Sequence, residues 1–239
     1  GLFGRELETV AHFIALAIPH AENDEQRAAI RSLLEFYRTG DENHFREHMV
    51  HWLKSAARVD YLNGFIESYL DPRGVIAQFE ANASFRAGGG AIEKIAASAS
   101  YFEAKMPWPD AYKRTDVSRP VATIVNVVVE TGDAGPVTAV GINLPNDQHV
   151  RERYGSKSVS LANVRDATEK SMLPEFRTEF SWTTEEAARS ERWSAVGGEL
   201  TTNMHEVIGH GSGKVEERLK GSPQTALKEQ YSALEEARA

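Results

Sequence analysis

The sequence has 239 residues, a net charge of -8 at pH 7, 41% hydrophobic residues and no cysteine. This length and composition favour a globular protein of one large domain or two small ones, and they argue against a disordered or low-complexity chain. The acidic balance argues against nucleic acid as a partner, because phosphates require a basic face. Without cysteine there are no disulfides or thiolate ligands, so any zinc ion must be held by His, Asp or Glu.

The longest apolar runs, such as FIALAI at residues 13–18, are far shorter than the ~20 residues that a membrane-spanning helix needs. The first residues also lack the ordered segments of a secretory signal. We therefore expect a cytoplasmic protein with no membrane partner. Because the chain starts at Gly1 without Met and stops at Ala239 within a helix-favouring run, we also expect it to be an excerpt of a longer protein.

The first half of the chain is helical by pattern. Apolar residues recur at three- and four-residue spacing through residues 7–18, 28–37 and 45–57, which predicts packed amphipathic helices. Asp71-Pro72-Arg73-Gly74 predicts a turn, and residues 75–105 then indicate a helix with a break at Gly88-Gly89-Gly90. The string MPWP at 106–109 should end this region, because proline cannot continue a helix.

A change to strand follows at residues 121–129, which are β-branched and continuous, as in a strand buried on both faces. A second strand is expected at 137–142, joined to the first by a hairpin turn at 132–136. Helical pattern returns after Ser160. The capping-box spacing of Thr183 and Glu186 predicts a helix start, and Ser222-Pro223 should open the last helix.

These elements predict a mainly α fold with a small β-sheet (α+β). We expect a helical region at residues 1–119, a small β region at 120–159 and a helical region at 160–239 that carries the zinc-binding motif.

That motif is the string HEVIGH at residues 205–210, in which His205 and His210 lie five residues apart. In a regular helix this spacing separates the two side chains by roughly 140°, too far for both to reach one ion. The helix must therefore loosen by one residue, as a π-bulge does, and Gly209 is a suitable place. Two imidazoles and the carboxylate of Glu236 then form a three-ligand site with an open position for water, which Glu206 would activate as general base.

Two other interpretations of the motif stay open. One is a chance arrangement of two histidines near a glutamate on an ordinary helix, because short patterns recur by accident. A purely structural zinc site is the other. Glu206 favours catalysis over the latter, because a structural site needs no adjacent general base and closes its fourth position with protein.

Further strings accompany the motif in order along the chain: GFIESY at 64–69 with Asp71-Pro72, MPWP at 106–109, GINLPN at 141–146, SLANV at 160–164, HEVIGHGSGK at 205–214 and EEARA at 235–239. Together they resemble the dipeptidyl peptidase III family of zinc metallopeptidases, and the likeness covers nearly the whole chain. The resemblance implies an exopeptidase that releases dipeptides from the N-terminus of short peptides. It also implies a helical zinc-binding lobe, part of a second lobe and a cleft between them.

The resemblance assigns His205, His210 and Glu236 to a single Zn²⁺ ion, and Glu206 to the activation of the zinc-bound water. These assignments agree with the reading from spacing alone.

Four further residues, within the first two regions, receive substrate roles from the resemblance. Glu67, Asn143 and Asn146 would hold the substrate's N-terminal ammonium, and Tyr69 would donate to the carbonyl under attack. The strand that ends at Asn143 would pair with an extended substrate. Structural roles stay open for all four: a helix-surface carboxylate, a core tyrosine, and asparagines that shape a turn.

The chain departs from the family pattern in two respects. Ala237 stands where the family often has Cys, at a position that is not a ligand. The chain also stops at Ala239, one residue before an acid that usually supports a histidine ligand, and it lacks other family segments at both ends. The remaining lobe segments of a parent chain are therefore expected partners, and activity of this piece alone is a separate question.

The function expected is thus a zinc-dependent exopeptidase acting on short peptides. The alternative is a noncatalytic or repurposed zinc-stabilised scaffold that binds a peptide or protein partner, and a nonpeptide substrate also stays open. His44, His48 and His51 form a second stripe, at i, i+4 and i+7, which we assign to an open solvated helix face rather than to a metal. The run around Gly211-Ser212-Gly213 fails the phosphate-loop pattern, because Ile208 occupies the first glycine position.

Overall fold

The computed structural model describes residues 3–68, 70–73, 75–88, 90–115, 121–135, 138–219 and 223–239. Tyr69, assigned to the substrate carbonyl, lies outside the described residues. The expected mainly α fold with a small sheet is confirmed, whereas the division at residues 119 and 159 stays a prediction.

Three helices begin the chain: α1 (Gly4–Ala17), α2 (Asp24–Thr39) and α3 (Glu42–Lys54). Helix α2 starts where the Asn23 side chain accepts from the Gln26 amide, and it ends at Gly40, whose φ of 72° suits glycine. Asp41 then caps α3. The three predicted helices are therefore confirmed, with the third ending at Lys54 rather than at residue 57.

The expectation of an interrupted helix over residues 75–105 is wrong in its first half. Residues 79–87 form strand β2 (Phe79–Ala87), which pairs with β1 (Val59–Phe65) on one side and with β3 (Val121–Gly132) on the other. Long-range pairing thus overrides the helical preference of the alanines in β2. Helices α4 (Ala91–Ala97) and α5 (Ala99–Lys105) begin only after Gly90.

The sheet has five strands in the order β1-β2-β3-β5-β4, which contradicts the expected hairpin after residue 129. Strand β4 (Gly141–Leu144) does not pair with β3, because β5 (Lys157–Leu161) lies between them. Strand β5 runs parallel to β3 and antiparallel to β4. Its five residues are buried throughout, and it lies in the interior of the sheet with β4 at the edge beyond it.

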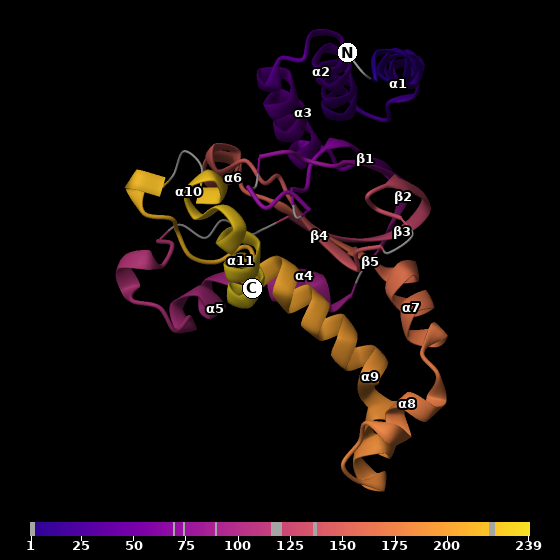
Figure 1. Ribbon diagram of the computed structural model, residues 1–239, viewed down its shortest axis with the longest axis vertical. Helices are drawn as coiled ribbons and strands as arrows, with labels where there is room; N and C mark the ends of the chain where they lie inside the picture. Colours follow the sequence, from indigo (N-terminus) through magenta and orange to yellow (C-terminus); the bar gives the residue numbers. More distant parts are fainter. Residues whose placement is uncertain are drawn as a thin grey trace.

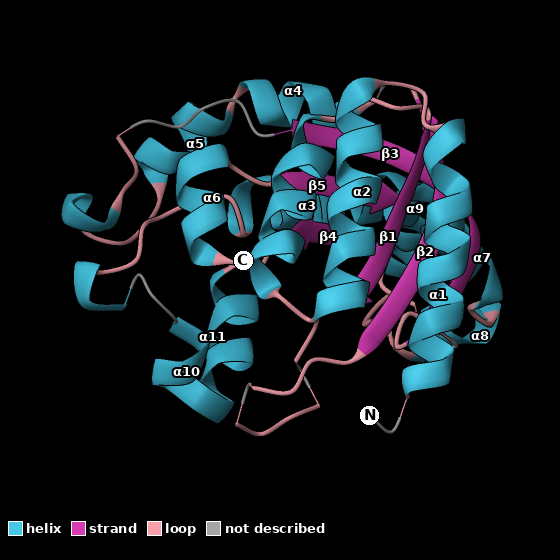
Figure 2. Ribbon diagram, turned by 90° about the horizontal axis from the view of Figure 1, so that it is seen from above, coloured by secondary structure: helices cyan, strands magenta, loops and turns pink. Residues whose placement is uncertain are grey.

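Helices lie on both sides of this sheet, and α8 with the adjoining end of α9 projects away from it (Figures 1 and 2). Helices α1–α3 lie on one side, and α4 and α9 on the other. The elements are α6 (Gln148–Tyr154), α7 (Ala162–Ser171), α8 (Pro174–Glu179), α9 (Thr184–Met204), a π-helical turn (His205–Gly209), α10 (Pro223–Leu227) and α11 (Tyr231–Arg238). Short 3-10 turns are found at Ile18–His20, Asp110–Tyr112, Glu217–Leu219 and Lys228–Gln230.

The predicted helix start at Thr183 is confirmed, and a helix does begin at Pro223, but it is a short one and the last helix is α11. The Thr183 hydroxyl accepts from the Glu186 amide at the start of α9, and the Glu186 carboxylate accepts from the Trp182 amide. Pro223 is the first residue of α10. No helix within the described ranges has both the length and the apolar character needed to cross a bilayer.

The core on the α3 side of the sheet encloses an ion pair. Lys157 is fully buried, and its Nζ lies 3.2 Å from Asp60 Oδ2 and 4.0 Å from the centre of the Trp52 ring. Asp60 Oδ1 also accepts from Trp52 Nε1 at 2.9 Å. Burial lowers the pKa of Lys157, and Asp60 opposes this effect.

The histidine stripe of α3 does not lie on an open face, contrary to expectation. His48 is 1% exposed, and its Nδ1 lies 3.0 Å from the Ala29 carbonyl. His51 contacts Glu25 on α2 at 2.7 Å, and His44 is paired with Glu47. The face is partly buried because α2 packs against it, so His48 and His51 connect the two helices, whereas His44 is paired within α3.

Replacing Asp60 with asparagine should destabilise the fold, because the buried Lys157 ammonium then loses its countercharge. We expect Asp60→Asn to lower the free energy of unfolding by about 3 kcal/mol in urea denaturation. The control Asp24→Asn removes an exposed ion pair with Arg27 and should leave the midpoint almost unchanged. Equal midpoints for the two variants would contradict a role for the buried pair.

Candidate metal centre and cavity

The π-helical turn continues α9 and carries both histidines of the motif. The amide of His210 donates to the carbonyl of His205 at 3.0 Å, an i to i+5 bond in place of the α-helical i to i+4 bond. The loosening by one residue that the spacing required is therefore present. The apolar side of the turn, Val207 and Ile208, packs against residues of α4 and α5.

The one-residue slip brings potential metal donors together. The Nε2 atoms of His205 and His210 lie 3.1 Å apart. Glu236, on α11, places Oε2 3.3 Å from His205 Nε2 and Oε1 3.8 Å from His210 Nε2. A tetrahedral ion with bonds of roughly 2.0–2.2 Å holds its donors about 3.3–3.6 Å apart. The three side chains therefore have the donor types and the spacing that fit one metal ion.

His210 is oriented by Glu235, a contact that the sequence analysis missed. His210 Nδ1 lies 3.0 Å from Glu235 Oε1, so its Nε2 is left for a metal. Arg238 donates to Glu235 Oε1 at 2.6 Å and to the Gly209 carbonyl at 2.8 Å, which ties α11 to the π-helical turn. Burial raises the pKa of Glu235, but the bonds from His210 and Arg238 outweigh it and lower the pKa to about 2. The i, i+3 spacing of Glu235 and Arg238 could have indicated this pair.

Glu206 is 6% exposed and lies beside the two histidines. One potential ligand atom from each of the three side chains lies within 4.8 Å of the other two. Burial is the main cause that raises the pKa of Glu206 to about 7; His210 lowers it, and Glu236 and Glu67 raise it further. Strand β4 touches the side chain so closely that a Cβ at Gly141 would lie 2.5 Å from Glu206 Oε1. A buried carboxyl of this kind is suited to proton transfer near neutral pH.

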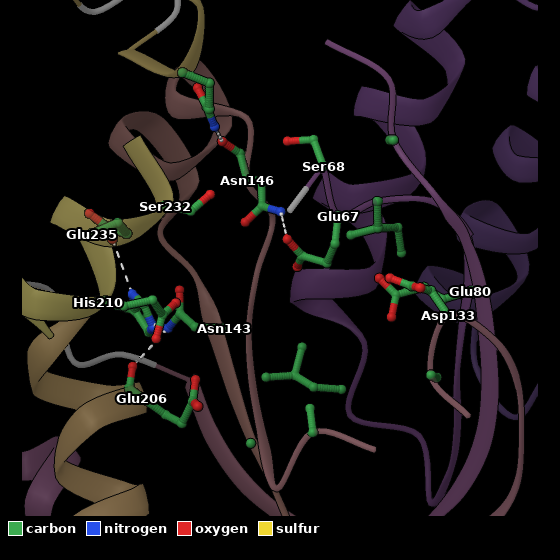
Figure 3. A pocket seen from close by; sticks show the side chains of 18 of the residues that line it. Glu67, Ser68, Glu80, Asp133, Asn143, Asn146, Glu206, His210, Ser232 and Glu235 are labelled. Atoms are coloured by element: carbon green, nitrogen blue, oxygen red, sulfur yellow. Dashed lines mark hydrogen bonds and ion pairs between the residues drawn. The ribbon is translucent and has the colours of Figure 1, made fainter. Parts of the chain in front are cut away.

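A cavity of about 690 Å³ adjoins these residues (Figure 3). Its lining is strongly acidic, with Arg151 as the single Lys or Arg among the described lining residues. Seven carboxylates face it: Glu67, Glu80, Glu130, Asp133, Glu206, Glu235 and Glu236. Burial, then Glu67, Asp133 and Glu130, raise the pKa of Glu80 to about 7. The electrostatics thus favour a cationic ligand.

The described members of the predicted substrate set also line this cavity. Asn146 Nδ2 donates to Glu67 Oε2 at 3.0 Å, so these two residues, 79 apart in sequence, form one unit. Asn143 instead turns its amide to the protein, where Nδ2 donates to the Glu206 carbonyl at 2.9 Å and to Ser158 Oγ at 2.8 Å. The structure thus brings the predicted residues together but adds a structural task for Asn143.

Neutralising the Glu235 carboxylate should weaken metal binding, because His210 then has an uncharged amide in place of the charged acceptor that fixes its orientation. With Zn²⁺ as the probe, we expect Glu235→Gln to weaken affinity about 10- to 100-fold in competition with a chelator. Glu229→Gln changes an exposed acid nearby and serves as the control. Equal affinities for the two variants would show that Glu235 does not support the site.

The chain resembles known proteins along most of its length. The profile of Peptidase family M49 matches residues 1–235. The chain is 30% identical over 212 residues to dipeptidyl peptidase 3 of Nematostella vectensis, covering 87% of this chain but only 28% of that relative. The structure of DPP III from Caldithrix abyssi matches with a TM-score of 0.75 and 25% identity, covering 98% of this chain and 45% of that one. Dipeptidyl-peptidase III from Corallococcus shares the fold, with a TM-score of 0.79 at 21% identity and coverage of 98% and 44%.

The match to the family profile extends over almost the entire chain and includes both histidines of the π-helical turn. The chain therefore belongs to Peptidase family M49.

Proposed function

We propose that the protein is a zinc-dependent exopeptidase that releases dipeptides from the N-terminus of short peptides. The observation that carries the proposal is the placement of a metal-ligand set, a buried Glu206 and the Glu67–Asn146 unit on one acidic cavity. Family membership and the activity named for the relatives support it. The chain spans less than half of the length of each of these relatives. The proposed activity is therefore that of a protein in which this segment forms part of the site.

His205, His210 and Glu236 would hold the ion, and the absence of cysteine leaves nitrogen and oxygen donors as the ligand set. Zn²⁺ bound there would lower the pKa of a coordinated water and polarise the scissile carbonyl.

Glu206 acts as general base and then as general acid. Its carboxylate accepts a proton as the water oxygen bonds to the scissile carbonyl carbon, and it returns a proton to the leaving nitrogen as the carbon–nitrogen bond breaks. The raised pKa of Glu206, about 7, suits both directions of transfer near neutral pH. Gly141, which has no side chain, leaves the space that the Glu206 carboxylate occupies.

The substrate's N-terminus would be read at the far side of the cavity. The Glu67 carboxylate, oriented by Asn146, would accept from the ammonium, and the neighbouring acids would add favourable charge. Strand β4 is an edge strand of the sheet, and Gly141, Ile142 and Asn143 line the cavity. An extended peptide can therefore pair with this strand through main-chain bonds, which favours broad sequence specificity.

Three parts of the proposal rest on the sequence. Tyr69 would donate to the carbonyl under attack. The cytoplasm is the proposed location, consistent with a chain without cysteine. Lobe segments of the kind that the longer relatives carry would complete the cleft.

Neutralising Glu206 should abolish turnover without removing the metal. We expect Glu206→Gln to lower kcat for an arylamide-coupled dipeptide by about 10²- to 10⁴-fold while the protein keeps one equivalent of Zn²⁺. Metal analysis and steady-state kinetics on the same preparations check this. A parent protein that holds zinc but hydrolyses nothing would support the scaffold alternative, and one that holds no zinc would exclude both.

Recognition of the N-terminus predicts a charge requirement. N-acetylation of the substrate should lower kcat/KM at least about 100-fold for the parent protein, because the ammonium no longer meets Glu67. Glu67→Gln should raise KM for the free amine and shrink that ratio, whereas Glu229→Gln should preserve it. If Glu67→Gln leaves the ratio intact, Glu67 does not read the N-terminus.

A further inference from the structure

The slip of the π-helical turn leaves one buried carbonyl without its helical donor. In a regular α-helix the amide of His210 would donate to the carbonyl of Glu206. In this turn that amide donates to His205 instead, at 3.0 Å. A buried carbonyl without a donor is unfavourable, so the π register requires a replacement donor at Glu206.

Two side chains from the adjacent strands supply the replacement. Ser158 Oγ, on β5, donates to the Glu206 carbonyl at 3.0 Å, and Asn143 Nδ2, on β4, donates to it at 2.9 Å. Asn143 and Ser158 are direct partners in the β4–β5 register and are joined by a 2.8 Å bond. We call Ser158 and Asn143 the carbonyl clamp.

The carbonyl clamp reaches both ends of the turn. Asn143 Oδ1 accepts from Arg151 Nη2 at 3.4 Å, and the same nitrogen donates to the His210 carbonyl at 2.7 Å. Because the bonds to Arg151 and to Glu206 need an oxygen and a nitrogen respectively, they fix the orientation of the amide. The clamp thus binds the Glu206 carbonyl directly and is linked to the His210 carbonyl through Arg151.

We propose that Ser158, together with Asn143, is a positioning residue that holds the turn in π register and thereby keeps His205, Glu206 and His210 in their reactive arrangement. This inference rests on the proposed function for its kinetic part. Ser158 is fully buried and is absent from the described residues that line the cavity, so it acts through Glu206 and not on the substrate.

Ser160 provides a matched control. It lies two residues along the same strand, so its side chain points to the same face, and it is also buried. Its Oγ has no hydrogen-bond partner among the described residues. Ser158→Ala and Ser160→Ala therefore delete the same atom from the same strand, and only the first removes a donor from the Glu206 carbonyl.

The test measures metal geometry as well as activity. With Co²⁺ as the probe, we expect Ser158→Ala to alter the visible absorption spectrum of the loaded protein and to weaken Zn²⁺ affinity about tenfold or more. Its kcat for the arylamide-coupled dipeptide should fall about 10- to 100-fold with KM changed less than about twofold. Ser160→Ala should match the parent in all three, and Ser158→Thr, which keeps the hydroxyl, should restore the parent spectrum.

A Ser158→Ala protein with the spectrum and affinity of Ser160→Ala overturns the proposal, even if its activity falls. If Ser158→Ala does not fold, Ser158→Cys replaces it, because a thiol is a weaker donor of similar shape, and the same altered spectrum is expected. A parent that binds metal but hydrolyses nothing would count against the proposed function, while the spectrum and affinity would still decide the clamp.

Discussion

The site depends on a single hydrogen bond that is displaced by one residue, from the His210 amide to the His205 carbonyl. In α-helical register the two imidazoles would diverge; in π register their Nε2 atoms lie 3.1 Å apart. The slip removes the helical donor of the Glu206 carbonyl, and the carbonyls of Gly209 and His210 lie at the end of the helix, so other parts of the structure bind all three. Ser158 and Asn143 bind that of Glu206, Arg151 binds that of His210, and Arg238 binds that of Gly209.

Strand β5 contacts both the core beneath α3 and the π-helical turn. Successive residues of a strand point to opposite faces, so Lys157 enters the core beneath α3 while Ser158 faces the π-helical turn. The buried ion pair with Asp60 anchors the strand on one side, and the Glu206 carbonyl anchors it on the other. Adjacent residues of β5 thus contact the core beneath α3 and the candidate metal centre.

Charge organises the cavity. Seven carboxylates line it, and the pKa values of Glu206 and Glu80 are each raised to about 7, chiefly by burial. Glu235 shows the opposite result, because bonds from His210 and Arg238 stabilise its ionised form and lower its pKa to about 2. Neighbouring acids of one chemical type therefore differ in pKa, because Glu235 is bound by His210 and Arg238 whereas Glu206 and Glu80 are buried near other carboxylates.

The sequence by itself determined the donor types of the candidate metal site and the local geometry of the helix that carries them. The five-residue histidine spacing demanded a loosened helix, and Thr183 and Pro223 marked helix starts, because these features depend on residues within one or two turns. Only the tertiary structure decided that residues 79–87 form a strand, that β5 separates β3 from β4, and that His48 is buried. It also decided that Asn143 holds the Glu206 carbonyl. These outcomes depend on partners tens of residues away, whose pairing free energy no local pattern contains.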